Sequence, residues 1–219
     1  MSAPSGAAAL VWSIADLRLG ILISGRGSNF DAIATAVSRH KLDAEIAVVI
    51  SNKADAPGLE IARERGIPMR VIASRGVERE AYDKLLVDEL RTHEVDLVCL
   101  AGFMRLLSTT FTSAFQGRLL NIHPSLLPAF PGLDAQRQAL QHGVKITGCT
   151  VHFVDEFLDS GPIIMQSAVP VLDTDTLETL SGRILIQEHL IYPKAIQLIA
   201  EGRVAIEGRR VTIADKEAD

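Results

Sequence analysis

The chain has 219 residues, of which 47% are hydrophobic and 22% charged, and its net charge is −5. These proportions match those of soluble globular proteins and exclude an intrinsically disordered chain. The sequence has no block of Lys and Arg, which argues against a nucleic-acid-binding protein, and no stretch approaches the ~20 apolar residues of a membrane span.

The two cysteines lie in apolar runs. Cys99 and Cys149 lack the CxxC spacing of metal and redox sites, so we expect buried free thiols in a reducing compartment. Residues 1–9 carry neither a basic segment nor a long apolar one, so they make a poor signal peptide. The sequence therefore predicts a cytoplasmic protein without a membrane anchor.

The first half of the chain alternates short apolar runs with helical patterns. The expected strands are 17–23, 46–50, 69–72, 95–100 and 119–122, and the expected helices lie near 30–37, 57–65, 78–93 and 109–115. Alternating strands and helices of this length indicate βαβ units. We predict an α/β protein with a Rossmann-like, three-layer α/β/α arrangement and a mainly parallel sheet.

The rhythm changes after Pro131. The expected elements are then a helix at about 134–142, strands at 146–154 and 161–171, a long helix at about 176–201 and a hairpin around 207–208. The two long strands are joined by an acidic loop, which predicts an antiparallel extension of the sheet in the C-terminal half. We expect Thr174 or Asp175 to cap the long helix at its N-terminus.

A glycine-rich loop, Ser24-Gly25-Arg26-Gly27-Ser28-Asn29, separates the first strand from the first helix. Backbone N–H groups at such a helix start can hold an anion. The third glycine of a dinucleotide fingerprint is replaced by Phe30, and the next strand ends in Ser51-Asn52 rather than in an acid, which disfavours NAD. A single phosphate fits better; the alternative is a tight turn with Ser28 or Asn29 as N-cap.

The most informative segment runs from 118 to 128. Asn121 and His123 are two residues apart in an expected strand, so they project to the same side. Pro124 and Pro128 force an irregular loop, which places the pair at the C-terminal edge of the sheet, where ligands bind. An amide and an imidazole together can stabilise an oxyanion and move a proton. These two residues alone also allow a purely structural role.

Other chemistries have weaker support. Asp159, before Ser-Gly-Pro, is either a turn former or a carboxylate that orients a histidine. Ser125 lies close to His123, but no G-x-S-x-G elbow is present, so a serine hydrolase is disfavoured. The six histidines show no HExxH or similar ligand pair, and we expect no metal.

Seven segments, in order from about residue 18 to 206, together resemble the phosphoribosylglycinamide formyltransferases. They are Ile-Ser-Gly-Arg-Gly-Ser-Asn (23–29), Ser-Asn-Lys-Ala-Asp-Ala (51–56), Leu-Ala-Gly-Phe-Met-Arg (100–105), Leu-Asn-Ile-His-Pro-Ser-Leu-Leu-Pro (120–128), Val-His-Phe-Val (151–154), Leu-Asp-Ser-Gly-Pro-Ile (158–163) and Gln-Glu-His-Leu-Ile-Tyr-Pro (187–193). The resemblance implies transfer of a formyl group from 10-formyltetrahydrofolate, as cosubstrate, to glycinamide ribonucleotide in purine (IMP) biosynthesis. Neither a metal nor a covalent intermediate is implied. The implied catalytic residues are Asn121, His123 and Asp159.

The resemblance also implies the binding residues. The nucleotide would contact Gly27, Ser28, Asn29, Met104 and Glu188. Folate would contact Arg105, Leu107, Asn121, His152, Val154, Asp155 and Leu158, with the backbone of the 155–159 loop gripping the pterin and His152 supporting the catalytic set. It makes Leu127–Pro128 a candidate cis peptide. Gln136 stands where many relatives have His, and Arg26 occupies a variable loop position.

The domain organisation follows from the same pattern. We expect one formyltransferase domain over 17–213, with a nucleotide-binding half at about 17–115 and a folate-binding, catalytic half at about 116–213. Residues 1–16 would form a flexible extension and 214–219 a loose tail. The expected partners are the two small-molecule substrates, with the protein a monomer or weak homodimer and with no nucleic acid or membrane bound.

Three alternatives remain. A formyltetrahydrofolate hydrolase shares the Asn–His–Asp set but passes the formyl group to water; it normally carries an extra N-terminal domain, whereas some 16 residues precede the first strand here. A formylase of initiator methionyl-tRNA would need a C-terminal RNA-binding domain. A non-catalytic nucleotide-binding module would keep the glycine loop without needing the polar triad.

Overall fold

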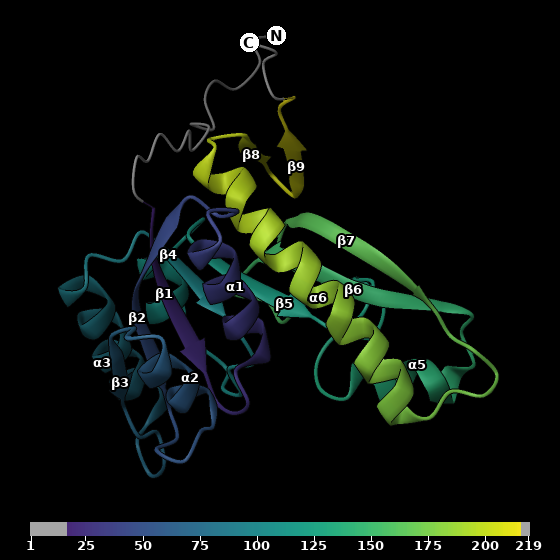
Figure 1. The fold of residues 1–219 in the computed structure, drawn as a ribbon, viewed down its shortest axis with the longest axis horizontal. Helices are drawn as coiled ribbons and strands as arrows, with labels where there is room; N and C mark the ends of the chain where they lie inside the picture. Colours follow the sequence, from purple (N-terminus) through teal and green to yellow (C-terminus); the bar gives the residue numbers. More distant parts are fainter. Residues whose placement is uncertain (1–16, 216–219) are drawn as a thin grey trace, which may run out of the picture.

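A computed structural model describes residues 17–215 and is built on a seven-stranded sheet in the order β3-β2-β1-β4-β5-β6-β7 (Figure 1). The strands are β1 (Leu17–Ile23), β2 (Ala44–Ser51), β3 (Met69–Val71), β4 (Leu97–Leu100), β5 (Leu119–His123), β6 (Ile146–Phe153) and β7 (Ile163–Pro170). Strands β1 to β5 pair in parallel, and β6 and β7 join antiparallel. The predicted mainly parallel sheet with an antiparallel extension is confirmed. The expected extension at 1–16 and the last four residues of the expected tail lie outside the described residues.

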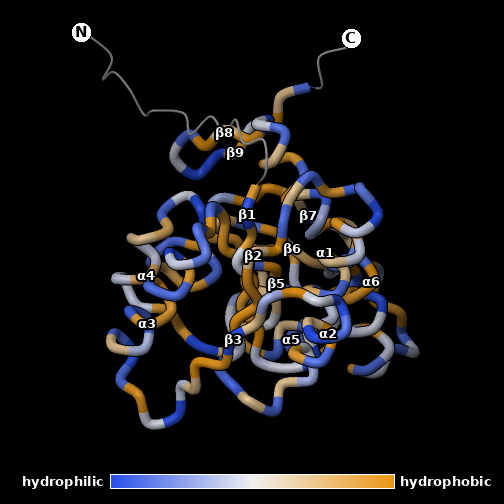
Figure 2. Tube along the Cα trace, turned by 60° about the vertical axis from the view of Figure 1, so that its left-hand side comes forward, coloured by the Kyte–Doolittle hydropathy of each residue, from blue (hydrophilic) through white to orange (hydrophobic). Residues whose placement is uncertain are grey.

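Helices cover both faces of the sheet. They are α1 (Ser28–Ser38), α2 (Gly58–Glu64), α3 (Arg79–Thr92), α4 (Thr109–Ala114), α5 (Ala135–His142) and α6 (Leu177–Ala200). One apolar core joins the sheet to α1, α2 and α6, and a second joins it to α3 and α4. Figure 2 shows the hydrophobic colouring concentrated along the central strands, as burial on both faces requires. The three-layer arrangement is therefore confirmed.

The C-terminal elements are the long helix α6 and a hairpin of β8 (Val204–Glu207) with β9 (Arg210–Ile213). The expected N-cap of α6 is wrong by one or two residues, because Thr176 holds that position and its hydroxyl accepts a hydrogen bond from the N–H of Thr179. Asp175 makes different contacts, since its carboxylate accepts hydrogen bonds from Arg183 and from the N–H of Leu172. The sequence contains several good caps in a row, and side-chain contacts select one.

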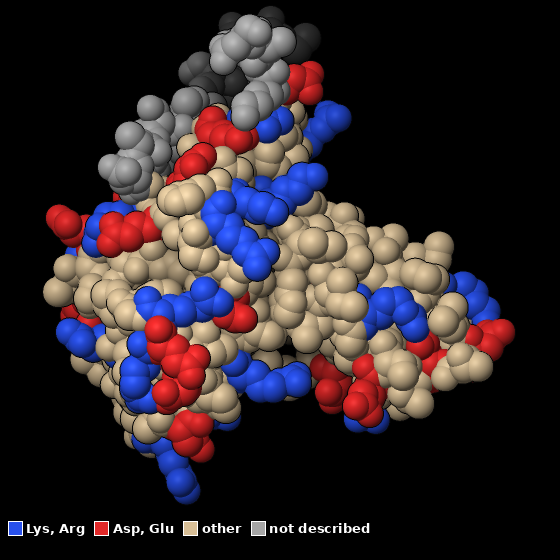
Figure 3. Space-filling view, in the orientation of Figure 1, with Lys and Arg blue, Asp and Glu red and all other residues tan. Residues whose placement is uncertain are grey.

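The strand order reverses between β1 and β4, and the loops after β1, β4 and β5 open at the same edge of the sheet. In open α/β sheets the crevice outside such a switch point is where ligands bind. Figure 3 shows a hollow on this side of the molecule, between the surface over α2 and the surface over α5, with acidic and basic side chains interspersed around it.

Candidate active site

The pair on β5 lies where the sequence predicted it. Asn121 is half-buried and His123 is buried, and both stand at the end of the strand. The antiparallel register sets Asn121 opposite His152 and His123 opposite Thr150. The side-chain nitrogen Nδ2 of Asn121 is 3.3 Å from Nε2 of His152. Strand pairing thus adds His152 to the predicted pair.

Asp159 comes from the loop between β6 and β7 and completes the cluster. Its Oδ2 atom is 3.4 Å from Nδ1 of His123, and its Oδ1 atom is 3.8 Å from Nε2 of His152. The N–H of Gly132 donates to the same carboxylate at 2.8 Å. Of the two roles left open for Asp159, the structure favours the carboxylate beside a histidine over a simple turn former.

The geometry of the β6–β7 loop follows from the contacts between its two ends. The N–H of Phe153 donates to the carbonyl of Pro162, which draws the two ends of the loop together. A Cβ on Gly161 would lie 1.9 Å from the carbonyl oxygen of Phe153, so only glycine fits there. Asp159 has a φ of 48°, a left-handed conformation that Asp and Asn tolerate better than most residues.

The loop after β5 is held by polar side chains that the sequence analysis did not single out. Gln166 donates to the carbonyl of Leu127 and to the hydroxyl of Thr150, each at 2.9 Å. Thr150 in turn donates to the carbonyl of Ser125 at 2.7 Å. A signal did exist for Thr150: it lies two residues before His152 on the expected strand, so the two polar side chains project to the same side.

Two expectations about this loop are confirmed. The peptide bond Leu127–Pro128 is cis. Ser125 is fully buried and its hydroxyl donates to the carbonyl of Ala129, so it is not a free nucleophile. This agrees with the rejection of a serine hydrolase.

Hydrogen bonds to carbonyl oxygens locate one ring hydrogen on each of the two histidines. Nε2 of His123 is 2.8 Å from the carbonyl oxygen of Phe130, and Nδ1 of His152 is 2.8 Å from that of Phe153. Because a carbonyl only accepts, each of these nitrogens carries a hydrogen. Burial lowers the pKa of His152, although the carbonyl of Phe153 and the carboxylate of Asp159 act in the opposite direction. The environment of His152 therefore favours the neutral ring.

The glycine loop begins α1 with Gly27, not Ser28 or Asn29, in the N-cap position at a φ of 73°. No side chain caps this helix in the described part of the chain, so its first N–H groups stay available to an anion. A Cβ on Gly27 would lie 2.8 Å from the Cα of Gly58, which was not foreseen as part of the site. The loop and the start of α2 therefore pack backbone to backbone.

The remaining predicted nucleotide residues border this loop. Asn29 Nδ2 donates to Glu188 Oε2 at 2.7 Å, and burial raises the pKa of that carboxyl group. The Asn29 side chain thus faces α6, which leaves its backbone N–H for an anion. The N–H of Met104 donates to the hydroxyl of Ser24 at 2.8 Å, which ties the loop after β4 to the glycine loop. The Met104 side chain itself is exposed.

Four of the predicted folate residues lie in three places outside the polar cluster. Leu107 and Val154 pack against the core that includes α4. Arg105 lies 4.6 Å from the ring centroid of Tyr82 and donates to the carbonyl of Ser74. Leu158 lines a cavity of about 190 Å³ together with Asp159 and the cis proline.

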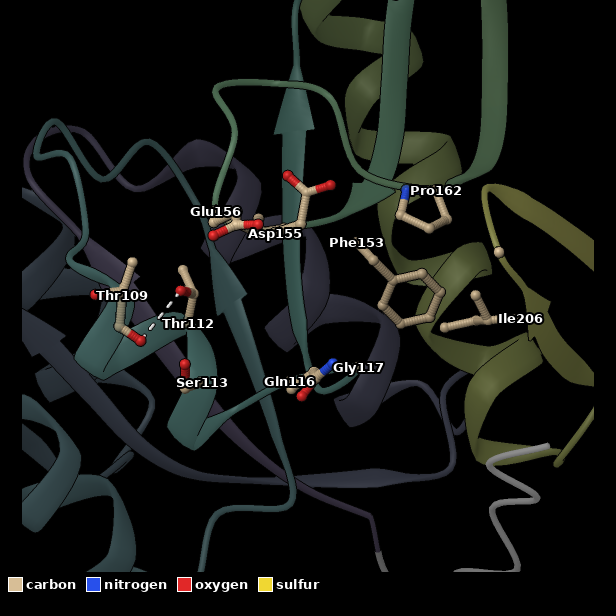
Figure 4. A pocket seen from close by; sticks show the side chains of 12 residues that line it. Thr109, Thr112, Ser113, Gln116, Gly117, Phe153, Asp155, Glu156, Pro162 and Ile206 are labelled. Carbon is tan, nitrogen blue, oxygen red and sulfur yellow. Dashed lines mark hydrogen bonds between the residues drawn. The ribbon is translucent and has the colours of Figure 1, made fainter. Parts of the chain in front are cut away.

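A larger cavity of about 700 Å³ lies between α4, the loop after β6 and the β8–β9 hairpin. Figure 4 shows Thr109 and Thr112 on one side, Asp155 and Glu156 above, and the apolar side chains of Phe153 and Ile206 on the other side. Val154 and Asp155 are the predicted folate residues that line it. The hairpin wall was not foreseen, because hairpins distant in sequence give no local signal of a shared cavity.

Three further findings concern the described residues alone. No group of three or more His, Cys, Asp or Glu side chains between 17 and 215 is arranged to hold a metal ion. None of the helices in that range is both long and apolar enough to cross a membrane. Cys99 and Cys149 are buried free thiols, as expected, and burial raises the pKa of each to about 12.

A comparison with known protein families finds a match over most of the chain. The sequence profile of the family described as formyl transferase matches residues 17–196. This chain belongs to the formyl transferase family.

Individual relatives narrow the family. The chain is 54% identical to glycinamide ribonucleotide transformylase 1 from Symbiobacterium toebii, with a TM-score of 0.91 over 96% of this chain and 100% of that one. It is 49% identical to phosphoribosylglycinamide formyltransferase from Escherichia coli (strain K12) over 189 residues, 86% of this chain and 89% of that protein. Within the formyl transferase family, its sequence and fold are those of the phosphoribosylglycinamide formyltransferases.

A longer relative contains the same unit. The chain is 50% identical over 204 residues to the trifunctional purine biosynthetic protein adenosine-3 of Drosophila pseudoobscura pseudoobscura. The match covers 92% of this chain but spans only 15% of the length of that protein.

Proposed function

We propose that the chain transfers the formyl group of 10-formyltetrahydrofolate to the amine of glycinamide ribonucleotide, a step of de novo purine biosynthesis. The products are formylglycinamide ribonucleotide and tetrahydrofolate. The observation that carries the proposal is the convergence of Asn121, His123 and Asp159, from two distant segments, at the ligand-binding edge of the sheet. The names and high identity of the relatives support the substrates.

The proposed chemistry is a direct transfer. The neutral amine attacks the formyl carbon, a new N–C bond forms, and the carbonyl electron pair moves onto oxygen. The amide N–H of Asn121 and the Nδ1–H of protonated His123 stabilise that oxyanion, each pre-positioned at the end of β5. Because Nε2 of His123 already donates to the carbonyl of Phe130, a hydrogen on Nδ1 requires the charged ring, which the neighbouring carboxylate of Asp159 stabilises. The intermediate then collapses, the bond from carbon to N10 of the folate breaks, and the oxyanion becomes the carbonyl of the product.

The proton follows a separate route. The attacking nitrogen becomes positively charged and must lose one proton, while the departing N10 must gain one. Asp159 accepts the first proton and delivers it to N10, directly or through water. Its carboxylate is mostly buried, with 10% of the side chain exposed, so it can reach a substrate yet is shielded from bulk water.

The nucleotide binds, in this proposal, across the crevice between β1 and β4. The phosphate meets the first N–H groups of α1 at Gly27, Ser28 and Asn29, where the helix dipole favours an anion. Glu188 accepts hydrogen bonds from the ribose hydroxyls, and Met104 lines the nucleotide site. The buried Oδ1 atom of Asn29, which has no protein partner among the described residues, can accept a further one.

Folate binds on the opposite side of Asn121. Leu107, Val154 and Leu158 supply apolar contacts, Arg105 flanks the ligand, and the backbone near Asp155 grips the pterin. The cavity beside α4 supplies room next to two of these residues. We propose one domain over 17–213, acting in the cytoplasm as a monomer or weak homodimer.

Consumption of 10-formyltetrahydrofolate by the purified chain, with and without glycinamide ribonucleotide, tests the proposal. We expect consumption only when the nucleotide is present, with one formylated nucleotide formed per folate released. Consumption without the nucleotide would identify a hydrolase instead. No consumption in either mixture, together with nucleotide binding by calorimetry, would identify a binding module and overturn the proposal.

A further inference from the structure

We propose that His152 is a positioning residue that fixes the orientation of the Asn121 amide, so that an N–H rather than the carbonyl faces the forming oxyanion. The inference rests on the proposed function for its catalytic meaning. It rests on geometry for the contact itself: the two side chains are opposite each other on β5 and β6, with 3.3 Å between Nδ2 of Asn121 and Nε2 of His152.

The first step of the argument is the tautomer of His152. Its Nδ1 atom is 2.8 Å from the carbonyl oxygen of Phe153, and a carbonyl cannot donate, so Nδ1 carries the hydrogen. In a neutral ring the other nitrogen, Nε2, then has a lone pair and only accepts. The backbone of β6 itself therefore sets the hydrogen-bonding character of the ring.

The second step concerns the amide of Asn121. A lone pair on Nε2 attracts the NH₂ end of the amide and repels the carbonyl end, which defines an orientation that heavy atoms alone leave ambiguous. One of the two N–H bonds meets His152. The other meets no protein acceptor among residues 17–215, so it is the donor available to substrate. A reversed amide would present its carbonyl and repel an oxyanion.

The third step is the charge around the ring. The side chain of His152 is 1% exposed, and the ionisable groups that face it are Asp159, His123 and Asp155. Burial is the dominant influence and favours the neutral ring. Protonation would turn Nε2 into a donor, which would lose the contact with Asn121 and draw Asp159 away from His123. The neutral state is thus the one that keeps all three predicted catalytic side chains in place.

A double-mutant cycle tests the coupling. The variants are His152→Leu, which removes the acceptor, His152→Gln, whose amide oxygen can replace Nε2 as acceptor, and Asn121→Ala. We expect kcat to fall about 10²–10³-fold in Asn121→Ala, as for loss of an oxyanion donor, and at least tenfold in His152→Leu. The double variant should match Asn121→Ala alone, because His152 acts through Asn121. KM for glycinamide ribonucleotide should change less than threefold, because neither side chain is among the predicted nucleotide contacts.

The controls separate positioning from folding. His152→Gln should recover kcat to within about tenfold of the wild type, and His93→Gln, at the opposite edge of the sheet, should leave kcat unchanged. Multiplicative losses in the double variant, or equal losses for His152→Leu and His152→Gln in well-folded proteins, would overturn the proposal.

A measurement without substrates keeps this inference distinct from the proposed function. Long-range ¹H–¹⁵N correlation NMR reports which ring nitrogen carries the hydrogen, and the Asn121 side-chain NH₂ signals report its hydrogen bond. We expect the Nδ1–H tautomer at neutral pH, and a shift of the Asn121 signals when His152 is replaced by Leu. If the wild-type chain is inactive, the proposed function fails, while this spectrum still decides the contact. The Nε2–H tautomer would contradict the inference outright.

Discussion

At the scale of single residues, the site depends on contacts between side chains that are far apart in sequence. Asp159 reaches His123 across 36 positions of chain, and its carboxylate also receives the N–H of Gly132. The left-handed backbone at Asp159 aims the carboxylate into the cluster, because an extended backbone at this point would change the direction of the side chain. A residue outside regular secondary structure is therefore positioned by contacts to the same cluster as its partners on the strands.

Replacing Asp159 by Asn tests its chemical role with little change of shape. Asn tolerates the same left-handed conformation, so the loop should keep its form. We expect kcat to fall about 10²–10⁴-fold, since a proton acceptor is lost, with the nucleotide dissociation constant within about twofold of the wild type. Steady-state kinetics and calorimetry measure the two quantities. Asp173→Asn, at an exposed residue paired with Lys145, is the matched control and should leave kcat unchanged. Retained turnover in Asp159→Asn would refute the proton-relay role.

At the scale of elements, local hydrogen bonds in α6 and in the β6–β7 loop support the geometry of the site. The capping box of Thr176 and Thr179 fixes where α6 begins. The same helix then carries Glu188 to Asn29 three turns further on, since a turn takes about 3.6 residues. In the β6–β7 loop, the hydrogen bond from the N–H of Phe153 to the carbonyl of Pro162 shapes the segment that presents Asp159.

The cap of α6 gives a prediction that distinguishes neighbouring threonines. Thr176→Ala should lower the free energy of unfolding by about 1 kcal/mol, because the N–H of Thr179 loses its acceptor. Thr174→Ala, at an exposed residue, should change it by less than about 0.5 kcal/mol. Urea denaturation followed by circular dichroism measures both. A larger cost at Thr174 would show that the helix begins elsewhere.

Replacing either of two glycines by alanine should change the free energy of unfolding, and the two changes should have opposite signs. Gly182 lies on the exposed side of α6, and a Cβ added there would meet nothing within 4 Å, so Gly182→Ala should raise the free energy of unfolding by about 0.5–1 kcal/mol. Gly161→Ala must push against the carbonyl of Phe153, and we expect a loss of about 1–3 kcal/mol. It should also lower kcat, because Asp159 lies two residues away. Chemical denaturation and kinetics on the same samples check both. Equal stabilities for the two variants would contradict the predicted geometry.

At the scale of the whole molecule, buried ionisable groups link stability to pH. Burial lowers the pKa of His189 from an ordinary value near 6.5, while burial raises the pKa of Glu188. Below pH 6.5 the unfolded state binds a proton at His189 more readily than the folded state does. The free energy of unfolding that this residue contributes therefore falls as pH falls. Glu188 acts with the opposite sign: its folded state keeps a proton that the unfolded state has released, so its contribution is lost as pH rises.

The opposite effects of His189 and Glu188 on the pH dependence of stability can be separated experimentally. Between pH 5 and 7, His189→Gln should make the rise of unfolding free energy with pH shallower, and Glu188→Gln should make it steeper. Urea denaturation at several pH values measures these slopes relative to the wild type. Parallel curves for all three proteins would show that neither group changes its pKa on folding. The measurement needs no substrate, so it is independent of the proposed function.

Much of the molecule could be predicted from the sequence because the relevant signals are local. Strands buried on both faces read as continuous apolar runs, and helices show their own periodicity, so the α/β class and nearly every element were within reach. Asn121 and His123 were identifiable for a similar reason, since one strand carries both at a spacing that fixes their common side. The family resemblance supplied Asp159 and Glu188 as members of the site.

Only the tertiary structure decided the contacts between segments. The antiparallel register of β5 and β6 brings His152 to Asn121, and the close approach of Gly27 and Gly58 joins two loops by their backbones. The choice of Thr176 over its neighbours depends on which hydroxyl meets an open N–H. Such contacts depend on packing and on register across the sheet. The local sequence around one residue does not indicate which distant residue it will contact. Local free energies therefore determined the elements of this protein, and long-range packing determined the geometry in which they meet.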